Sequence, residues 1–356
     1  MENFLPTLWF ILIAILWIGY LFLEGFDLGV GMLLKVLGKN DKERRIMINT
    51  IGPVWDGNEV WLLTAGGATF AAFPNWYASL FSALYIPLVI VLLGLIMRGV
   101  AIDYRGKGSS RKWREGWDNA MAIGSLLAAF GIGAGLALTT TGLPINANGD
   151  RDGNPFSFLN LYAIIGGFAV VGFCLVHAAI FLALKTDGEI RTKSRAFALK
   201  FLPIFLIPVV LWVLVIQFQH ANKIFGYILI LIAVAAVAFA WLQLKALDDG
   251  KENHEGKAFI GLGLFLVAGV ASIFYNVYPV VLPSTIDPAF NLTITNASST
   301  NYTLTVMSFV ALVGVPVVLA YQAWTYWVFR KRISTDMIPD EHIIPEKIRE
   351  KILAKD

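Results

Sequence analysis

The chain has 356 residues and a formal net charge of +3, with 57% of its residues hydrophobic and 15% charged. In a soluble domain about a quarter of the residues are charged, so this composition excludes a disordered chain, a nucleic-acid-binding domain and a secreted disulfide scaffold. The single cysteine, Cys174, forms neither an internal disulfide nor a cysteine metal site, and its apolar neighbours predict inert packing.

Nine apolar stretches are long enough to cross a bilayer, which takes roughly 20 residues. We therefore expect an all-α integral membrane protein with nine transmembrane helices. The first stretch lacks a basic leading segment and carries Glu24 and Asp27 near its end, which favours a retained span over a signal peptide. In chain order the stretches are residues 5–34, 49–73, 76–100, 117–139, 158–184, 197–217, 224–244, 258–275 and 304–329.

The distribution of lysine and arginine predicts the orientation of these spans. If the nine spans alternate across the membrane, 26 basic residues fall on one side and two on the other. The positive-inside rule then places the N-terminus outside and the C-terminus in the cytoplasm. We expect residues 1–332 to form a single transmembrane domain, with the loop 276–303 outside. Residues 333–356 would form a charged cytoplasmic tail, as a short helix or a disordered segment.

Two pairs of acidic residues lie inside the first two predicted spans, where ionisable groups are costly. Glu24 and Asp27 are three residues apart, as are Asp56 and Glu59, so each pair shares one helix face. The predicted orientation puts the second pair about 10 Å from the inner end of its span, at a depth similar to that of the first pair. The four carboxyl groups should therefore meet on adjacent antiparallel helices.

Four neighbouring carboxyl groups in a medium of low dielectric constant cannot all be ionised, so they could share and pass protons. The alternative is that they pair with Arg98, a backbone group or another subunit and only hold helices together. Asn58 could bridge two carboxyl groups or satisfy a helix contact.

Other polar residues receive simpler interpretations. We expect Arg98 and the triplet 103–105 to act as interfacial anchors, and Asp118 to stabilise the start of the fourth span through the helix dipole. His177 is the one histidine well inside a span. A hydrogen-bonded interior role is expected for it, with haem contact or proton transfer as the alternative.

Several motifs together resemble one family. They are Gly-Phe-Asp-Leu-Gly-Val-Gly at 25–31, the block 46–72 with Pro-Val-Trp-Asp-Gly-Asn-Glu-Val-Trp-Leu at 53–62, Phe-Pro-Asn-Trp-Tyr-Ala at 73–78, Asp-Tyr-Arg at 103–105, Val-Leu-Pro-Ser-Thr at 281–285 and Thr-Leu-Thr-Val-Met at 303–307. This pattern is similar to that of subunit II of cytochrome bd-type quinol oxidases, over nearly the whole chain.

The resemblance implies a heterodimer of two homologous membrane subunits, to which small accessory subunits can attach, in the prokaryotic cytoplasmic membrane. Each subunit would contain two four-helix bundles plus one peripheral helix, here within 1–139, 157–276 and 300–332. Subunit I would carry haems b558, b595 and d. The complex would oxidise quinol and reduce O2 to water with protons from the cytoplasm, which generates a proton motive force.

For this chain the resemblance implies support of subunit I and no redox step of its own. It assigns a proton path to Asp27 and Asp56, to which we add Glu24, with Asn58 and Glu59 as supporting groups. Some members of the family hold a quinone near the residue that matches Trp55. The competing hypotheses are a proton-coupled secondary transporter and a purely structural subunit.

Overall fold

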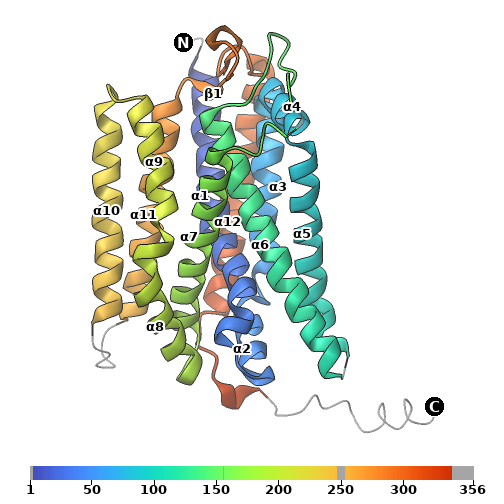
Figure 1. Ribbon diagram of the computed structural model, residues 1–356, viewed down its shortest axis with the longest axis vertical. Helices are drawn as coiled ribbons and strands as arrows, with labels where there is room; N and C mark the ends of the chain where they lie inside the picture. The colour runs from blue at the N-terminus through green and yellow to red at the C-terminus, as the bar shows by residue number, and fades with distance from the viewer. Residues whose placement is uncertain (1–2, 109, 155, 247–252, 339–356) are drawn as a thin grey trace, which may run out of the picture.

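Long helices that run nearly parallel to one another make up most of the protein in a computed structural model (Figure 1). The structure describes residues 3–338 except 109, 155 and 247–252. The helices of the first part are α1 (Phe4–Leu37), α2 (Asp41–Ile51), α3 (Trp55–Ala72), α4 (Pro74–Ala83), α5 (Tyr85–Tyr104), η1 (Arg105–Lys107) and α6 (Arg111–Thr141). Those of the second part are α7 (Leu161–Lys185), α8 (Gly188–Phe205), α9 (Ile207–Gln219), α10 (Ile224–Lys245), α11 (His254–Val277), η2 (Pro288–Phe290), α12 (Asn301–Val328) and η3 (Thr335–Met337).

The predicted second span is the one that does not correspond to a candidate membrane helix in the described part of the chain. Within the described residues, eight helices or helix pairs are long and apolar enough to cross a membrane. The stretch 49–73 is not one continuous helix, because α2 ends at Ile51 and α3 begins at Trp55. Helix α3 has 18 residues and carries three polar side chains in its first turns, which lowers its apolar content. The count of nine, the orientation and the division into two bundles stay predictions.

Helix α2 occupies most of the segment 35–48, which lies between the first two predicted spans. Asn40 caps its start by accepting a hydrogen bond from the Glu43 backbone N–H at 2.9 Å. Glu43 in turn accepts one from the Lys39 backbone N–H at 2.8 Å. Such reciprocal capping satisfies amide groups that the first helical turn leaves free. Hydrophobicity did not predict this helix because the segment is polar, although the Asn40 cap was present in the sequence.

Two further predicted spans are broken helices. The stretch 76–100 divides at Leu84, between α4 and α5. The stretch 197–217 divides at Leu206, between α8 and α9, where Pro203 and Pro208 remove backbone donors on both sides of the break. Both breaks lie inside expected spans, so apolar length alone did not reveal them.

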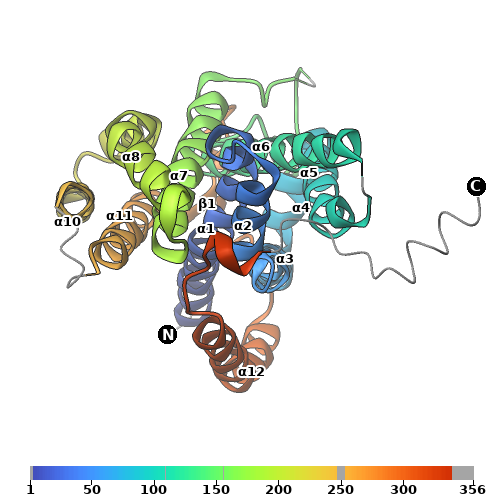
Figure 2. The ribbon, with the colours of Figure 1, turned by 90° about the horizontal axis from the view of Figure 1, so that it is seen from below.

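Helices α1 and α7 form the centre of the molecule, whereas α10 and α12 lie at its edge (Figure 2). Among the candidate spans, α7 is the most deeply buried and α12 the least. Gly29 allows α1 to approach α7 closely, because a Cβ atom there would lie only 2.0 Å from the carbonyl oxygen of Cys174. Cys174 is fully buried beside this contact, as expected for a packed thiol.

The loop 276–303 is ordered by a short antiparallel pair, β1 (Val280–Leu282) and β2 (Leu292–Thr293). At the opposite end, Ile333 exchanges backbone hydrogen bonds with the turn after α7, since its N–H donates to Lys185 and its C=O accepts from Asp187. Of the expected tail 333–356, residues 339–356 lie outside the described residues.

The close approach at Gly29 can be tested with two alanine substitutions. Gly29→Ala should destabilise the protein by about 1–3 kcal/mol, because the added methyl group meets backbone that cannot move aside. Gly269→Ala is the matched control, since Gly269 lies in α11 beside an apolar cavity of about 40 Å³ and a Cβ atom there meets nothing within 4 Å. We expect a lower thermal midpoint for Gly29→Ala only. Equal midpoints would contradict the packing described here.

Candidate functional site

The carboxyl groups of α1 lie at the centre of the molecule. Glu24 and Asp27 are both fully buried on the face that α1 turns toward α3 and α5. The two groups are close enough to share a hydrogen bond when one of them carries a proton. Their three-residue spacing on one helix face produces this proximity, as the sequence predicted.

Arg98 of α5 is the cation of this site. Its side chain is 0% exposed and forms an ion pair with Glu24 and a longer one with Glu59 of α3, at 3.4 Å between Nη1 and Oε2. The expected role of interfacial anchor is therefore wrong, and the pairing with Arg98 that was the alternative is confirmed for Glu24 and Glu59. One guanidinium group faces three carboxyl groups, because Asp27 also interacts with it electrostatically.

Asn58 joins the α1 pair to the rest of the site. Its Nδ2 donates to Asp27 Oδ2 at 2.6 Å and to the Leu23 carbonyl oxygen at 3.2 Å. Its Oδ1 accepts from the Tyr326 hydroxyl at 2.8 Å and from Gln322 Nε2 at 3.2 Å. Asn58 thus bridges one carboxyl group to α12, so the expected bridge between two carboxyl groups is wrong and the alternative, a helix contact, is confirmed.

Gln322 and Tyr326 are site residues that the sequence analysis missed. They are four positions apart in α12, so they share a helix face, and Gln322 also accepts a hydrogen bond from Trp61 Nε1 at 2.9 Å. The available signal was a polar pair at helical spacing in an otherwise apolar span.

Asp56 lies at the edge of the site. It is exposed on α3 and forms no ion pair with the described residues, although its charge acts on Glu59. The expectation that four carboxyl groups would be buried together is right for Glu24, Asp27 and Glu59 and wrong for Asp56. Trp55, one residue earlier, is half-buried, and the Arg98 Cζ atom lies 5.7 Å from its ring centroid.

Several buried polar atoms of the site have no hydrogen-bond partner among the described residues. Buried polar atoms are normally satisfied, so the two carboxyl oxygens have capacity to bind protons, and all of these atoms have capacity to bind water molecules. They are Tyr20 Oη, Glu24 Oε2, Asp27 Oδ1, Arg98 Nε and Arg98 Nη2.

His177 of α7 lies in an aromatic pocket apart from these ion pairs. Its Nε2 atom is 2.8 Å from the Phe22 carbonyl oxygen, which confirms a hydrogen-bonded interior histidine. The Phe173 and Phe259 rings stack on the imidazole at centroid distances of 5.0 and 4.7 Å. Phe22 and Phe26 pack against it at tilted angles.

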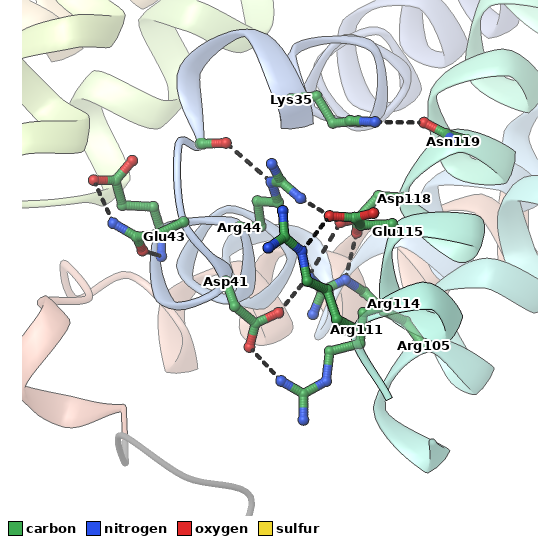
Figure 3. Close-up of polar contacts among 12 residues, drawn as sticks. Lys35, Asp41, Glu43, Arg44, Arg105, Arg111, Arg114, Glu115, Asp118 and Asn119 are labelled. Atoms are coloured by element: carbon green, nitrogen blue, oxygen red, sulfur yellow. Dashed lines mark hydrogen bonds and ion pairs between the residues drawn. The ribbon is translucent and has the colours of Figure 1, made fainter. Parts of the chain in front are cut away.

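A second charged network ties α2 to α6 at the end of the molecule where α1 ends (Figure 3). Asp118 is fully buried and pairs with Arg105 and with Arg44, the latter at 3.0 Å. Asp41 pairs with Arg105 at 2.8 Å and with Arg114 at 3.0 Å. The roles expected for two of these residues are wrong. Asp118 lies seven residues inside α6, which starts at Arg111, and Arg105 is only 4% exposed.

Comparison with known proteins gives a consistent result across the chain. The family model described as cytochrome bd terminal oxidase subunit II matches residues 5–329. Cytochrome bd ubiquinol oxidase subunit 2 of Bacillus subtilis is 42% identical over 333 residues, which cover 93% of this chain and 97% of that one. Cytochrome bd-I ubiquinol oxidase subunit 2 of Escherichia coli K12 is 35% identical over 366 residues, which cover 94% and 96%.

A solved structure has the same fold. A chain of the bd oxidase from Geobacillus thermodenitrificans superposes with a TM-score of 0.76 at 19% sequence identity, covering 91% of this chain and 98% of that chain.

The dependence of the buried site on Arg98 leads to a stability prediction. Arg98→Ala leaves Glu24 and Glu59 without their cation, and breaking a buried ion pair costs about 3–5 kcal/mol. Arg111→Ala is the control, because it removes an exposed pair with Glu115 in which side-chain exposure is 90% and 41%. Thermal unfolding of the purified protein should show a large decrease for the first variant and no measurable one for the second. Equal midpoints would refute a structural role for Arg98.

Proposed function

The chain belongs to the cytochrome bd terminal oxidase subunit II family, and from this premise we propose that its buried carboxyl groups relay protons to the partner subunit. It is a membrane-spanning subunit of a quinol oxidase, an oxidoreductase complex of the respiratory chain. The family match favours this function over the proton-coupled secondary transporter. We further infer residence in the prokaryotic cytoplasmic membrane.

We propose that haems b558, b595 and d and the oxidation of quinol belong to subunit I. His177 is the one histidine well inside a described span, and its surroundings do not fit a haem. Phenylalanine rings contact the imidazole on both faces and on its edges, and one ring nitrogen is bonded to backbone. This packing supports a chain that carries no redox step itself.

Subunit I would cover the face formed by α3 and α12. Helix α12 is almost entirely exposed, with Leu312 at 72%, and α3 exposes Leu63 to the same degree. Large exposed apolar patches mark interaction sites with lipid or protein. Asp56 is the charged residue of α3 that reaches this exposed face, which supports its contact with subunit I. Small accessory subunits remain compatible with the other faces.

The proposal rests on one observation. In the buried site three carboxyl groups face a single cation, Arg98, and a fourth carboxylate, that of Asp56, is exposed at the edge of the site. Asp27 and Glu24 would take up protons from the cytoplasmic side, and Asp56 would carry them toward the partner. Glu59 lies between the two, with its side chain 24% exposed and bound to Arg98. Asn58 holds Asp27 in place. Protons delivered in this way would serve the reduction of O2 to water and the generation of proton motive force.

Two further features belong to the same proposal. We count α3, the second predicted span, as crossing the membrane, because the polar residues at its start have buried partners: Glu59 pairs with Arg98 and Asn58 donates to Asp27. This brings the spans to nine, with the N-terminus outside and the C-terminus inside. The half-buried ring of Trp55 on α3 offers an aromatic surface for a bound quinone.

Amide substitutions separate a proton relay from a purely structural subunit. Asp27→Asn and Asp56→Asn keep the side-chain shape but remove the ionisable group, so we expect quinol oxidase turnover to fall about tenfold or more while haem content is retained. Asp152→Asn, at an exposed residue of the loop before α7, is the control and should leave turnover unchanged.

Turnover and haem spectra would be measured on the purified complex, together with proton uptake in reconstituted vesicles. Unchanged turnover with full haem content in both variants would refute the relay. Loss of haem in both variants would instead favour a structural role for these carboxyl groups.

A further inference from the structure

The break between α8 and α9 leaves a groove beside α10, away from the carboxyl site. The groove has a volume of about 420 Å³ and almost purely apolar walls. Helix α8–α9 contributes Pro203, Ile207 and Val210, α10 contributes Val234 and Trp241, and Phe265 of α11 is also part of the wall. Helix α10 lies at the edge of the molecule beside α11 (Figures 1 and 2), so the groove opens on the surface that would face lipid.

Two lysines extend the groove at the end of the molecule predicted to face the cytoplasm. Lys200 precedes Pro203 by three residues and Ile207 by seven, so it continues the groove-lining face of α8. Lys245 follows Trp241 by four residues and continues the lining face of α10. Both lysines are exposed, and neither pairs with a carboxylate among the residues that the structure describes.

An aromatic residue joins the apolar and the charged parts of the groove. The Lys245 Nζ atom lies 3.6 Å from the Trp241 ring centroid, and the Lys200 Nζ atom lies 5.1 Å from that of Phe201. The Trp241 indole N–H has no acceptor within the described part of the chain. Tryptophan with lysine at the end of an apolar helix face is the usual composition of the membrane interface.

We propose that this groove binds one anionic phospholipid of the inner leaflet, with an acyl chain against α8–α9 and α10 and the phosphate at Lys200 and Lys245. The apolar wall from Val234 to Trp241 is about 10 Å long, which suits part of an acyl chain that runs along the membrane normal. Two exposed lysines without a carboxylate partner among the described residues match a negatively charged headgroup, and they favour a zwitterionic headgroup less. The proposal is independent of the proton relay, since it uses none of its residues.

Native mass spectrometry of the purified oxidase complex in detergent would test this, with phosphatidylglycerol and phosphatidylcholine of equal chain length titrated separately. Lys200→Gln combined with Lys245→Gln should weaken the tightest phosphatidylglycerol site about 25-fold, since each lysine at a membrane surface contributes about fivefold. Phosphatidylcholine binding should not change. The control is Lys39→Gln combined with Lys112→Gln, which removes two exposed lysines elsewhere and should leave both lipids unaffected.

A second variant tests the acyl-chain part of the site. Ala238 lines the groove and is exposed, so Ala238→Trp should fill the groove without disturbing the core and should abolish the tightest phosphatidylglycerol site. Unchanged phosphatidylglycerol binding in either the lysine or the tryptophan variant would overturn the proposal. An equal loss of both lipids in the lysine variant would also overturn it, because headgroup charge would then play no part.

Discussion

The burial of the Arg98 guanidinium among carboxyl groups is the constraint on which the centre of this protein depends. A charge inside a bilayer is costly, and an isolated one does not persist there without partners. Arg98 binds α1 through Glu24 and α3 through Glu59, so a single side chain of α5 specifies how three helices meet. Replacing Arg98 by a neutral residue would leave Glu24 and Glu59 without an ion-pair partner among the described residues. The third carboxyl group, Asp27, depends instead on Asn58 and thereby on α12.

Much of this site followed from residue spacing. The pairs at 24 and 27 and at 56 and 59 predicted that α1 and α3 pack against each other through their acidic faces. The hydrogen bond between Asp27 of α1 and Asn58 of α3 confirms this contact. Local spacing could not reveal how far each side chain is from the surface. It placed Asp56 with the others although α3 turns this residue outward, and it placed Arg98 at the interface although α5 continues to Tyr104.

The remaining errors have a common cause, which is that contacts distant in sequence decided the outcome. Gln322 and Tyr326 reach Asn58 across more than 260 residues, and no local pattern specifies that contact. Asp118 was assigned to a helix start because the apolar run begins there. In the structure α6 starts earlier, and Arg44 and Arg105 draw Asp118 into a network that joins α2 to α6. The break at Leu206 was signalled by prolines on both sides, but the apolar run across it concealed that signal.

The polar contacts of α12 determine its rotation about its own axis. Near one end, Trp9 donates hydrogen bonds to the Leu304 carbonyl oxygen and to Ser308, and near the other end Gln322 and Tyr326 hold Asn58. Apolar packing alone would allow such an exposed helix to roll, whereas directional hydrogen bonds at two levels permit one angular setting. The surface that α12 offers to a neighbour is therefore defined before the neighbour arrives. The orientation of α12 depends on the Asn58 amide, which also positions Asp27. One side chain therefore sets both the surface that α12 presents and the geometry of the carboxyl site.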